Sequence, residues 1–124
     1  WEYVRSVLRN RANVFGVADL LRNSLSSPHA FSMTYRNSMR TGFSNFSDYL
    51  NDKGIENKRN FGAMYRHKCL QGLGLEENCP NSEWVGNNGG HIGVHRYLSK
   101  EDLDYIIESI IVFFKQEWRY HASI

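Results

Sequence analysis

The chain of 124 residues has room for one domain, since domains usually span about 100–150 residues. Its composition, 41% hydrophobic, 14% aromatic and 23% charged, is typical of a globular protein and excludes disordered, collagen-like and low-complexity classes. No stretch approaches the roughly 20 consecutive apolar residues that span a bilayer, so we expect neither a membrane span nor a membrane partner.

Charge is distributed unevenly along the chain. Up to Lys68 there are eleven Lys and Arg against five Asp and Glu, a net charge of +6, and from Cys69 onward the net charge is −4. The basic half is suited to face an anion, which could be a nucleic acid, a nucleotide phosphate or an acidic protein surface.

Two cysteines without a visible signal peptide indicate reduced thiols in the cytoplasm. Because the chain begins at Trp1 rather than Met, we expect a further segment upstream.

The first half of the chain alternates between helical and extended patterns. Apolar residues spaced by three, four and seven predict an amphipathic helix over residues 1–25, which the Ser-Ser-Pro of residues 26–28 ends. Strict alternation of apolar and polar residues predicts a strand over 31–35. A second helix is predicted over 43–53, with Gly54 as its left-handed stop.

The second half is richer in glycine. A short strand is weakly indicated over 55–61, and most of residues 62–90, with six of the ten glycines, is predicted to be loop. A strand over 91–95 follows. Ser99 and Asp102 then resemble a capping box that opens a helix with a wide apolar stripe. This order predicts an α/β lobe of the α+β type, with helices packed on a small sheet of about three strands.

Two features that suggest chemistry have simpler explanations. His91 and His95 have a spacing that chelates zinc on a helix, but on a strand it places the two rings roughly 13 Å apart. Cys69 and Cys79 do not have a zinc-finger spacing, so we expect no metal site. The glycine-rich residues 86–90 match neither the dinucleotide fingerprint nor the P-loop, and we interpret them as a turn before the strand.

A basic cluster stands out in or beside the central loop. It consists of Lys58, Arg59, Arg66, His67 and Lys68. Such a cluster can hold phosphates or carboxylates, and it can equally be a solvated basic surface. No Ser-His-acid grouping and no Gly-x-Ser-x-Gly motif indicates nucleophilic catalysis.

Three blocks in order resemble one protein family. FSDYLNDKGIENK (46–58) resembles the "L-x-x-K-G-I-E-T-R" segment of the DegT/DnrJ/EryC1/StrS family of nucleotide-sugar enzymes. NNGGHIGVHRYLSKEDLDYI (87–106) resembles that family's closing strand and its "L-S-E-E-D-I-D-Y" helix start, in a form most similar to the sugar 3-dehydratase branch. FGAMYRH (61–67) stands where the family has a substrate-facing loop. The resemblance covers about residues 31–115.

The resemblance implies a fold and a place within it. The family has the aspartate-aminotransferase fold (PLP fold type I), uses pyridoxal or pyridoxamine phosphate and normally forms homodimers. Residues 1–124 correspond to its C-terminal small domain alone. The PLP-binding large domain, with the catalytic Lys or the His that replaces it in some 3-dehydratases, has no counterpart here. We therefore expect this chain to hold no catalytic residue, no complete active site and no bound cofactor by itself.

The resemblance further implies substrate-binding residues, namely Lys58, Arg66, His67 and His95. Lys58 stands where the family usually has Arg, and His67 where the dehydratases tend to have Gln. The implied function is that of a cytoplasmic nucleotide-sugar 3-dehydratase or aminotransferase in deoxysugar or surface-polysaccharide synthesis, including that of lipopolysaccharide. Its partners would be the nucleotide sugar, the large domain and a homodimer mate.

The alternative is a non-catalytic, stand-alone binding module that uses its basic surface to hold an anionic partner. The enzyme hypothesis expects an unsatisfied interface on the first helix, at Val7 and Val14, whereas the module hypothesis expects that helix to be buried. Sequence-specific nucleic-acid binding has only the charge asymmetry in its favour, so we expect no nucleic-acid partner.

Overall fold

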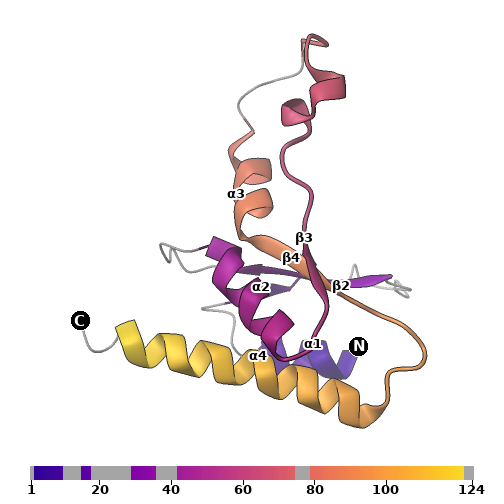
Figure 1. Ribbon diagram of the computed structural model, residues 1–124, viewed down its shortest axis with the longest axis vertical. Helices are drawn as coiled ribbons and strands as arrows, with labels where there is room; N and C mark the ends of the chain where they lie inside the picture. The colour runs from indigo at the N-terminus through magenta and orange to yellow at the C-terminus, as the bar shows by residue number, and fades with distance from the viewer. Residues whose placement is uncertain (1, 10–14, 18–28, 36–41, 75–78, 122–124) are drawn as a thin grey trace.

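The computed structural model describes residues 2–9, 15–17, 29–35, 42–74 and 79–121. Within them, helices α1 (Glu2–Arg9), α2 (Gly42–Asp52) and α4 (Lys100–His121) lie on one side of a four-stranded sheet (Figure 1). All neighbouring strands are antiparallel, in the order β1 (Phe15–Val17), β2 (Ala30–Tyr35), β4 (Gly89–Gly93), β3 (Asn57–Arg59). The predicted α/β lobe is confirmed, with one strand more than expected.

The core lies between the helices and one face of the sheet. The predicted strand over 31–35 is confirmed as β2, whose Phe31, Met33 and Tyr35 are buried. α2 and α4 complete the core with six aromatic and aliphatic side chains that stack in one cluster. These are Phe43, Phe46, Leu50, Ile110, Phe113 and Phe114.

The ends of the predicted helices are confirmed by their local geometry. Gly54, which follows α2, has φ +72°, the left-handed conformation that glycine adopts without strain. At the start of α4, the backbone N–H of Ser99 donates to the Asp102 carboxylate at 2.8 Å, and the Asp102 N–H donates to the Ser99 hydroxyl at 3.1 Å. This is the reciprocal arrangement of a capping box, with Asp in place of Glu.

The helix predicted over residues 1–25 is wrong at residues 15–17, which are extended. α1 ends at Arg9, and residues 15–17 form β1, which pairs with β2. The sequence Val-Phe-Gly-Val around Gly16 suits an extended conformation, and pairing with a buried strand outweighs the helical spacing. The predicted end of the helix at residues 26–28, together with Val14, lies outside the described residues.

The loop predicted over 62–90 is wrong at its end. Residues 80–88 form the helix α3 (Pro80–Asn88), which begins with Pro80 in its first turn. α3 buries no residue, so it has no apolar stripe from which it could be predicted. With the 3₁₀ helices η1 (Met64–Arg66) and η2 (Lys68–Leu70), α3 forms an arm of residues 60–74 and 79–88 that extends away from the sheet (Figure 1).

The turn predicted over 86–90 is also wrong, because α3 continues directly into β4. The glycines are required by close packing. A Cβ at Gly86 would lie 2.8 Å from the Cα of Gly62, and one at Gly90 would lie 1.9 Å from the Phe43 ring. The strand predicted over 91–95 therefore begins two residues earlier, at Gly89, and ends at Gly93, which leaves His95 beyond it.

Candidate functional site

A pocket of about 580 Å³ opens where the starts of β2 and β3, the end of β4 and the start of α4 meet. Ile55, Ile92 and Ile106 give it a buried apolar floor. Its polar lining combines groups that bind anions with groups that accept hydrogen bonds from hydroxyls. These are His29, Glu56, Asn57, Lys58, His91, His95, Asp102 and Tyr105.

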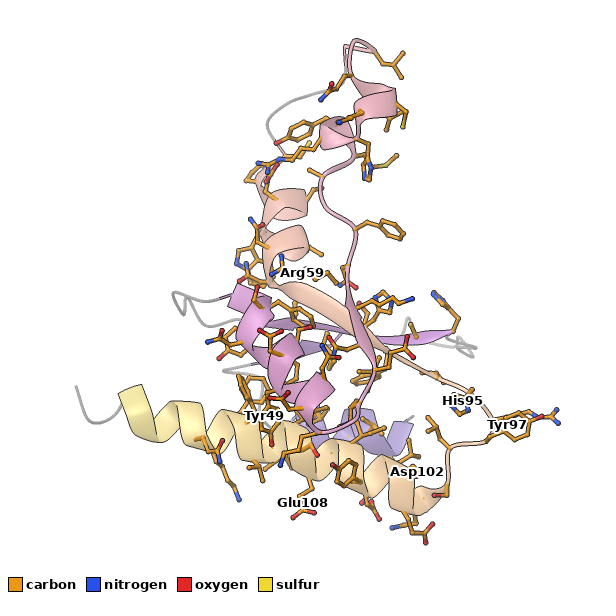
Figure 2. All side chains as sticks on the ribbon, in the orientation of Figure 1. Tyr49, Arg59, His95, Tyr97, Asp102 and Glu108 are labelled. Atoms are coloured by element: carbon orange, nitrogen blue, oxygen red, sulfur yellow. The ribbon has the colours of Figure 1, made fainter. Side chains whose placement is uncertain are left out.

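Lys58 and His95, two of the four residues predicted to bind substrate, lie in this pocket. Lys58 is an exposed residue in the middle of β3, on the strand that the weak pattern over 55–61 predicted. His95 is exposed on the segment between β4 and α4, with its ring centroid 6.3 Å from that of Tyr97. Figure 2 shows this segment beside the start of α4, where Asp102 lies.

Asp102 keeps a negative charge at the pocket. Hydrogen bonds from the backbone N–H and the hydroxyl of Ser99 lower the pKa of its carboxyl group below the ordinary 3.8, and the nearby His95 adds to this effect. The capping box thus has two roles. It starts α4, and it holds the chain that carries His95 against the helix.

Arg66 and His67, the other two predicted residues, lie on the arm and do not line the pocket. The Arg66 guanidinium is 2.7 Å from the Glu83 carboxylate of α3, and the Tyr65 hydroxyl donates to the same carboxylate. The bond to Glu83 raises the pKa of Tyr65 above its ordinary value. Glu83 thus offsets the charge of Arg66, while His67 and Lys68 remain exposed.

The basic cluster predicted from the sequence is therefore divided by the fold. Lys58 and Arg59 belong to the sheet, whereas Arg66, His67 and Lys68 belong to the arm. Sequence reasoning missed His29 and His91 as pocket residues. Their ring centroids are 6.5 Å apart, and His91 lies directly opposite Lys58 in the β3–β4 pair. The register between two strands distant in sequence brings these groups together.

Two kinds of site are not found in the described residues. They contain no group of three or more His, Cys, Asp and Glu side chains suited to hold a metal ion. None of the helices described is long and apolar enough to cross a membrane.

The described residues also do not make a pyridoxal phosphate site. Such a site needs a lysine or substitute group over the cofactor, a partner for the pyridine nitrogen and a phosphate cradle. The pocket is lined by an exposed Lys58 and by His29, His91 and His95, which suit an anionic or hydroxylated group.

Comparison with solved structures identifies the fold. The chain superposes with a TM-score of 0.74 on a DegT DnrJ EryC1 StrS aminotransferase from Brucella abortus, at 20% identity over 90% of this chain. It superposes at 0.73 on a GDP-4-keto-6-deoxymannose-3-dehydratase (ColD) variant with bound GDP-perosamine, at 20% identity over 87%. For the sugar aminotransferase CalS13 from Micromonospora echinospora the TM-score is 0.68, at 15% identity over 88%.

The similarity lies in structure rather than in sequence. No protein-family model matches the chain, and no curated protein matches it in sequence. The chain spans only 28% of the length of each of these three structures. At the level of fold, the resemblance to DegT/DnrJ/EryC1/StrS proteins is thus confirmed: the chain has the fold of a part of these sugar aminotransferases and 3-dehydratases.

Proposed function

We propose that residues 1–124 are the C-terminal small domain of a cytoplasmic, pyridoxal or pyridoxamine phosphate-dependent enzyme that acts on a nucleotide sugar in deoxysugar or surface-polysaccharide synthesis, such as that of lipopolysaccharide. The observation that carries this is the shared fold. One similar structure holds GDP-perosamine and another a PLP-glutamate adduct. The domain would close over the substrate, with a large domain and a homodimer mate completing the site.

In this proposal the pocket is the surface that faces the substrate. Lys58 and His95 would bind the sugar nucleotide there, and Arg66 and His67 would reach it only from the arm. The cofactor, held in the large domain, would supply the electron sink for chemistry at the sugar carbon. Of the two reactions, 3-dehydration is favoured over amino transfer because of the Asn-Asn…Ile-Gly-Val pattern of residues 87–94.

The test begins with the coding sequence upstream of Trp1. We expect it to encode a large domain whose cofactor-linking position holds Lys for amino transfer or His for dehydration.

The whole polypeptide should then bind GDP-perosamine in calorimetry. Lys58→Ala or His95→Ala should weaken binding about 10-fold, as expected for a lost charged hydrogen bond. Lys115→Ala, an exposed change on α4, is the control. An upstream stop codon, or no binding of the nucleotide sugar, would refute the proposal.

One observation favours the alternative, a binding module without catalysis. α1 is packed into the core through Val4 and Leu8, and Val7 is half-buried against the same cluster. A folded module of this kind would bind an anionic partner through its basic residues in a salt-sensitive way. Binding of polyphosphate by the 124-residue chain that disappears at high salt, with no preference for a nucleotide sugar, would support it.

A further inference from the structure

A polar row crosses the sheet on the face opposite the core. His91 in β4 lies directly opposite Ser32 in β2 and directly opposite Lys58 in β3. Directly opposite residues of antiparallel strands share a face, and the neighbouring Phe31 and Ile92 point into the core. Ser32, His91 and Lys58 therefore lie side by side on the outer face, and His91 and Lys58 are also among the residues that line the pocket at the end of the sheet.

Asn60, just after β3, is held across this row by three hydrogen bonds. Its backbone N–H donates to the carbonyl oxygen of Gly89 at 3.0 Å. Its side-chain Nδ2 donates to the Ser32 hydroxyl at 3.2 Å, and its Oδ1 lies 3.0 Å from Nδ1 of His91. Gly89 leaves room for the amide, since a Cβ there would lie 2.7 Å from Nδ2. In the structure the Nδ2 of Asn60 thus faces Ser32, and its Oδ1 faces His91.

This orientation of the Asn60 amide favours one position for the proton on the His91 ring. Because Nδ2 of Asn60 faces Ser32, its Oδ1 faces His91, and an amide oxygen can only accept. A neutral His91 must then donate from Nδ1, which leaves the lone pair on Nε2. His91 lines the pocket, whereas Asn60 does not. Nδ1 of His91 is therefore occupied by a residue outside the pocket, and Nε2 is the ring nitrogen left for a ligand.

We infer that Asn60 is a positioning residue that holds His91 in its Nδ1–H form, so that Nε2 of His91 and the ammonium group of Lys58 act as an acceptor–donor pair for the hydroxyl groups of a sugar. Directly opposite residues on paired strands have Cβ atoms about 4.5–5.5 Å apart, close enough for both side chains to contact one hexose. Each hydroxyl both donates and accepts, so it can use both members of the pair. The identity of the ligand rests on the proposed function, but the protonation of His91 does not.

The first experiment measures the protonated nitrogen directly. Two-bond ¹⁵N–¹H spectra of the ¹⁵N-histidine-labelled 124-residue chain, recorded in alkaline buffer where imidazole side chains are neutral, should show the proton of His91 on Nδ1. Asn60→Ala should move the proton toward Nε2, and Ser32→Ala, which releases only the amide nitrogen, should cause a smaller change in the same direction. Asn45→Ala, an exposed change in α2, is the matched control and should have no effect. A wild-type proton on Nε2, or an unchanged spectrum in Asn60→Ala with the other histidine signals in place, would overturn the role of Asn60.

The second experiment tests the ligand in the whole polypeptide encoded by the gene. His91→Phe should weaken binding of GDP-perosamine about 2- to 10-fold, as expected for one lost hydrogen bond, and should leave the affinity for GDP unchanged because GDP has no hexose. Equal losses for both probes, or none, would overturn the sugar pair. A wild-type protein that binds neither probe would overturn the proposed function and the sugar assignment together, and the spectra would still decide the role of Asn60.

Discussion

Gly90 is a position where a single methyl group should disturb the core. A Cβ there would lie 1.9 Å from Cζ of Phe43, whose side chain is 1% exposed and has no free space into which to move. We expect Gly90→Ala to lower the free energy of unfolding by about 1–3 kcal/mol, the range for overpacking a core. Urea unfolding measures this as a lower midpoint.

Gly93 is the matched control on the same strand. A Cβ at Gly93 meets no atom within 4 Å, so Gly93→Ala should leave the midpoint almost unchanged. Equal midpoints for Gly90→Ala and Gly93→Ala would show that the Phe43 ring does not lie against β4 as described.

The capping box gives stability that depends on pH. Hydrogen bonds from Ser99 lower the pKa of Asp102 in the folded chain below the ordinary 3.8 of the unfolded chain. The unfolded state therefore binds the proton more readily, so this contribution is complete above pH 3.8 and is lost as pH falls through the lower folded value. Asp102→Ala should remove the corresponding part of the fall in unfolding midpoint between pH 5 and pH 3.

Glu108→Gln, on the same helix, serves as the control for Asp102. Glu108 is exposed and, among the described residues, makes no hydrogen bond or ion pair. Its variant should keep the full acid dependence of the wild-type chain. If Asp102→Ala and Glu108→Gln lose the same share of that dependence, the capping box is not its source.

The helices and strands that bury an apolar face could be predicted from the sequence. Those that bury no such face could not. α2, β2 and α4 each turn a periodic set of large side chains toward one cluster, and that periodicity is visible in the sequence. α3 buries nothing, and β1 forms because residues 15–17 pair with residues 33–35. Both depend on contacts with segments distant in the chain, which no local pattern contains.

The same limit applies to the candidate site. The resemblance pointed to Lys58 and His95, which share the pocket. It also pointed to Arg66, because residues 61–67 stand where the family has a substrate-facing loop. The chain leaves the sheet at Asn60, so Arg66 lies on the arm with Glu83 instead. His91 and Asn60, 31 positions apart, are joined by strand register.

The arm owes its shape to a contact between its two limbs. Tyr65 and Arg66 on one limb bind Glu83 on the other. Glu83→Ala should increase hydrogen exchange at residues 60–74 and 79–88, and tryptic cleavage after Arg66 and Lys68. The free energy of unfolding should change by less than about 1 kcal/mol, because partly exposed ion pairs contribute little to global stability.

Glu101→Ala, an exposed change in the first turn of α4, is the control for Glu83→Ala. It should leave exchange in the arm as in the wild-type chain. Protection of the arm that is equal in wild type and Glu83→Ala would show that the Gly62–Gly86 contact alone holds the limbs together.

For the whole molecule, the most exposed aliphatic and phenyl side chains lie on the arm rather than on the first helix. Phe61 is 86% exposed, Met64 67% and Leu73 65%, whereas in α1 Val4, Val7 and Leu8 pack against the core and only Tyr3, at 48%, is exposed among the described apolar residues. Exposed apolar side chains provide the surface to which hydrophobic dyes bind. We therefore expect the triple change of Phe61, Met64 and Leu73 to Ser to remove most of the fluorescence of bound anilinonaphthalene sulfonate, with the unfolding midpoint unchanged.

The matched control replaces exposed aromatic area elsewhere. Tyr97 and Tyr105 are 76% and 49% exposed and lie outside the arm, so changing both to Ser should leave dye binding largely intact. A Val7→Ser change distinguishes α1 from the arm, because Val7 packs against the core and its loss should lower stability before it alters dye binding. Dye fluorescence that falls with Val7→Ser in a fully folded chain, and not with the triple change, would place the uncovered surface at α1, where the enzyme hypothesis first expected it.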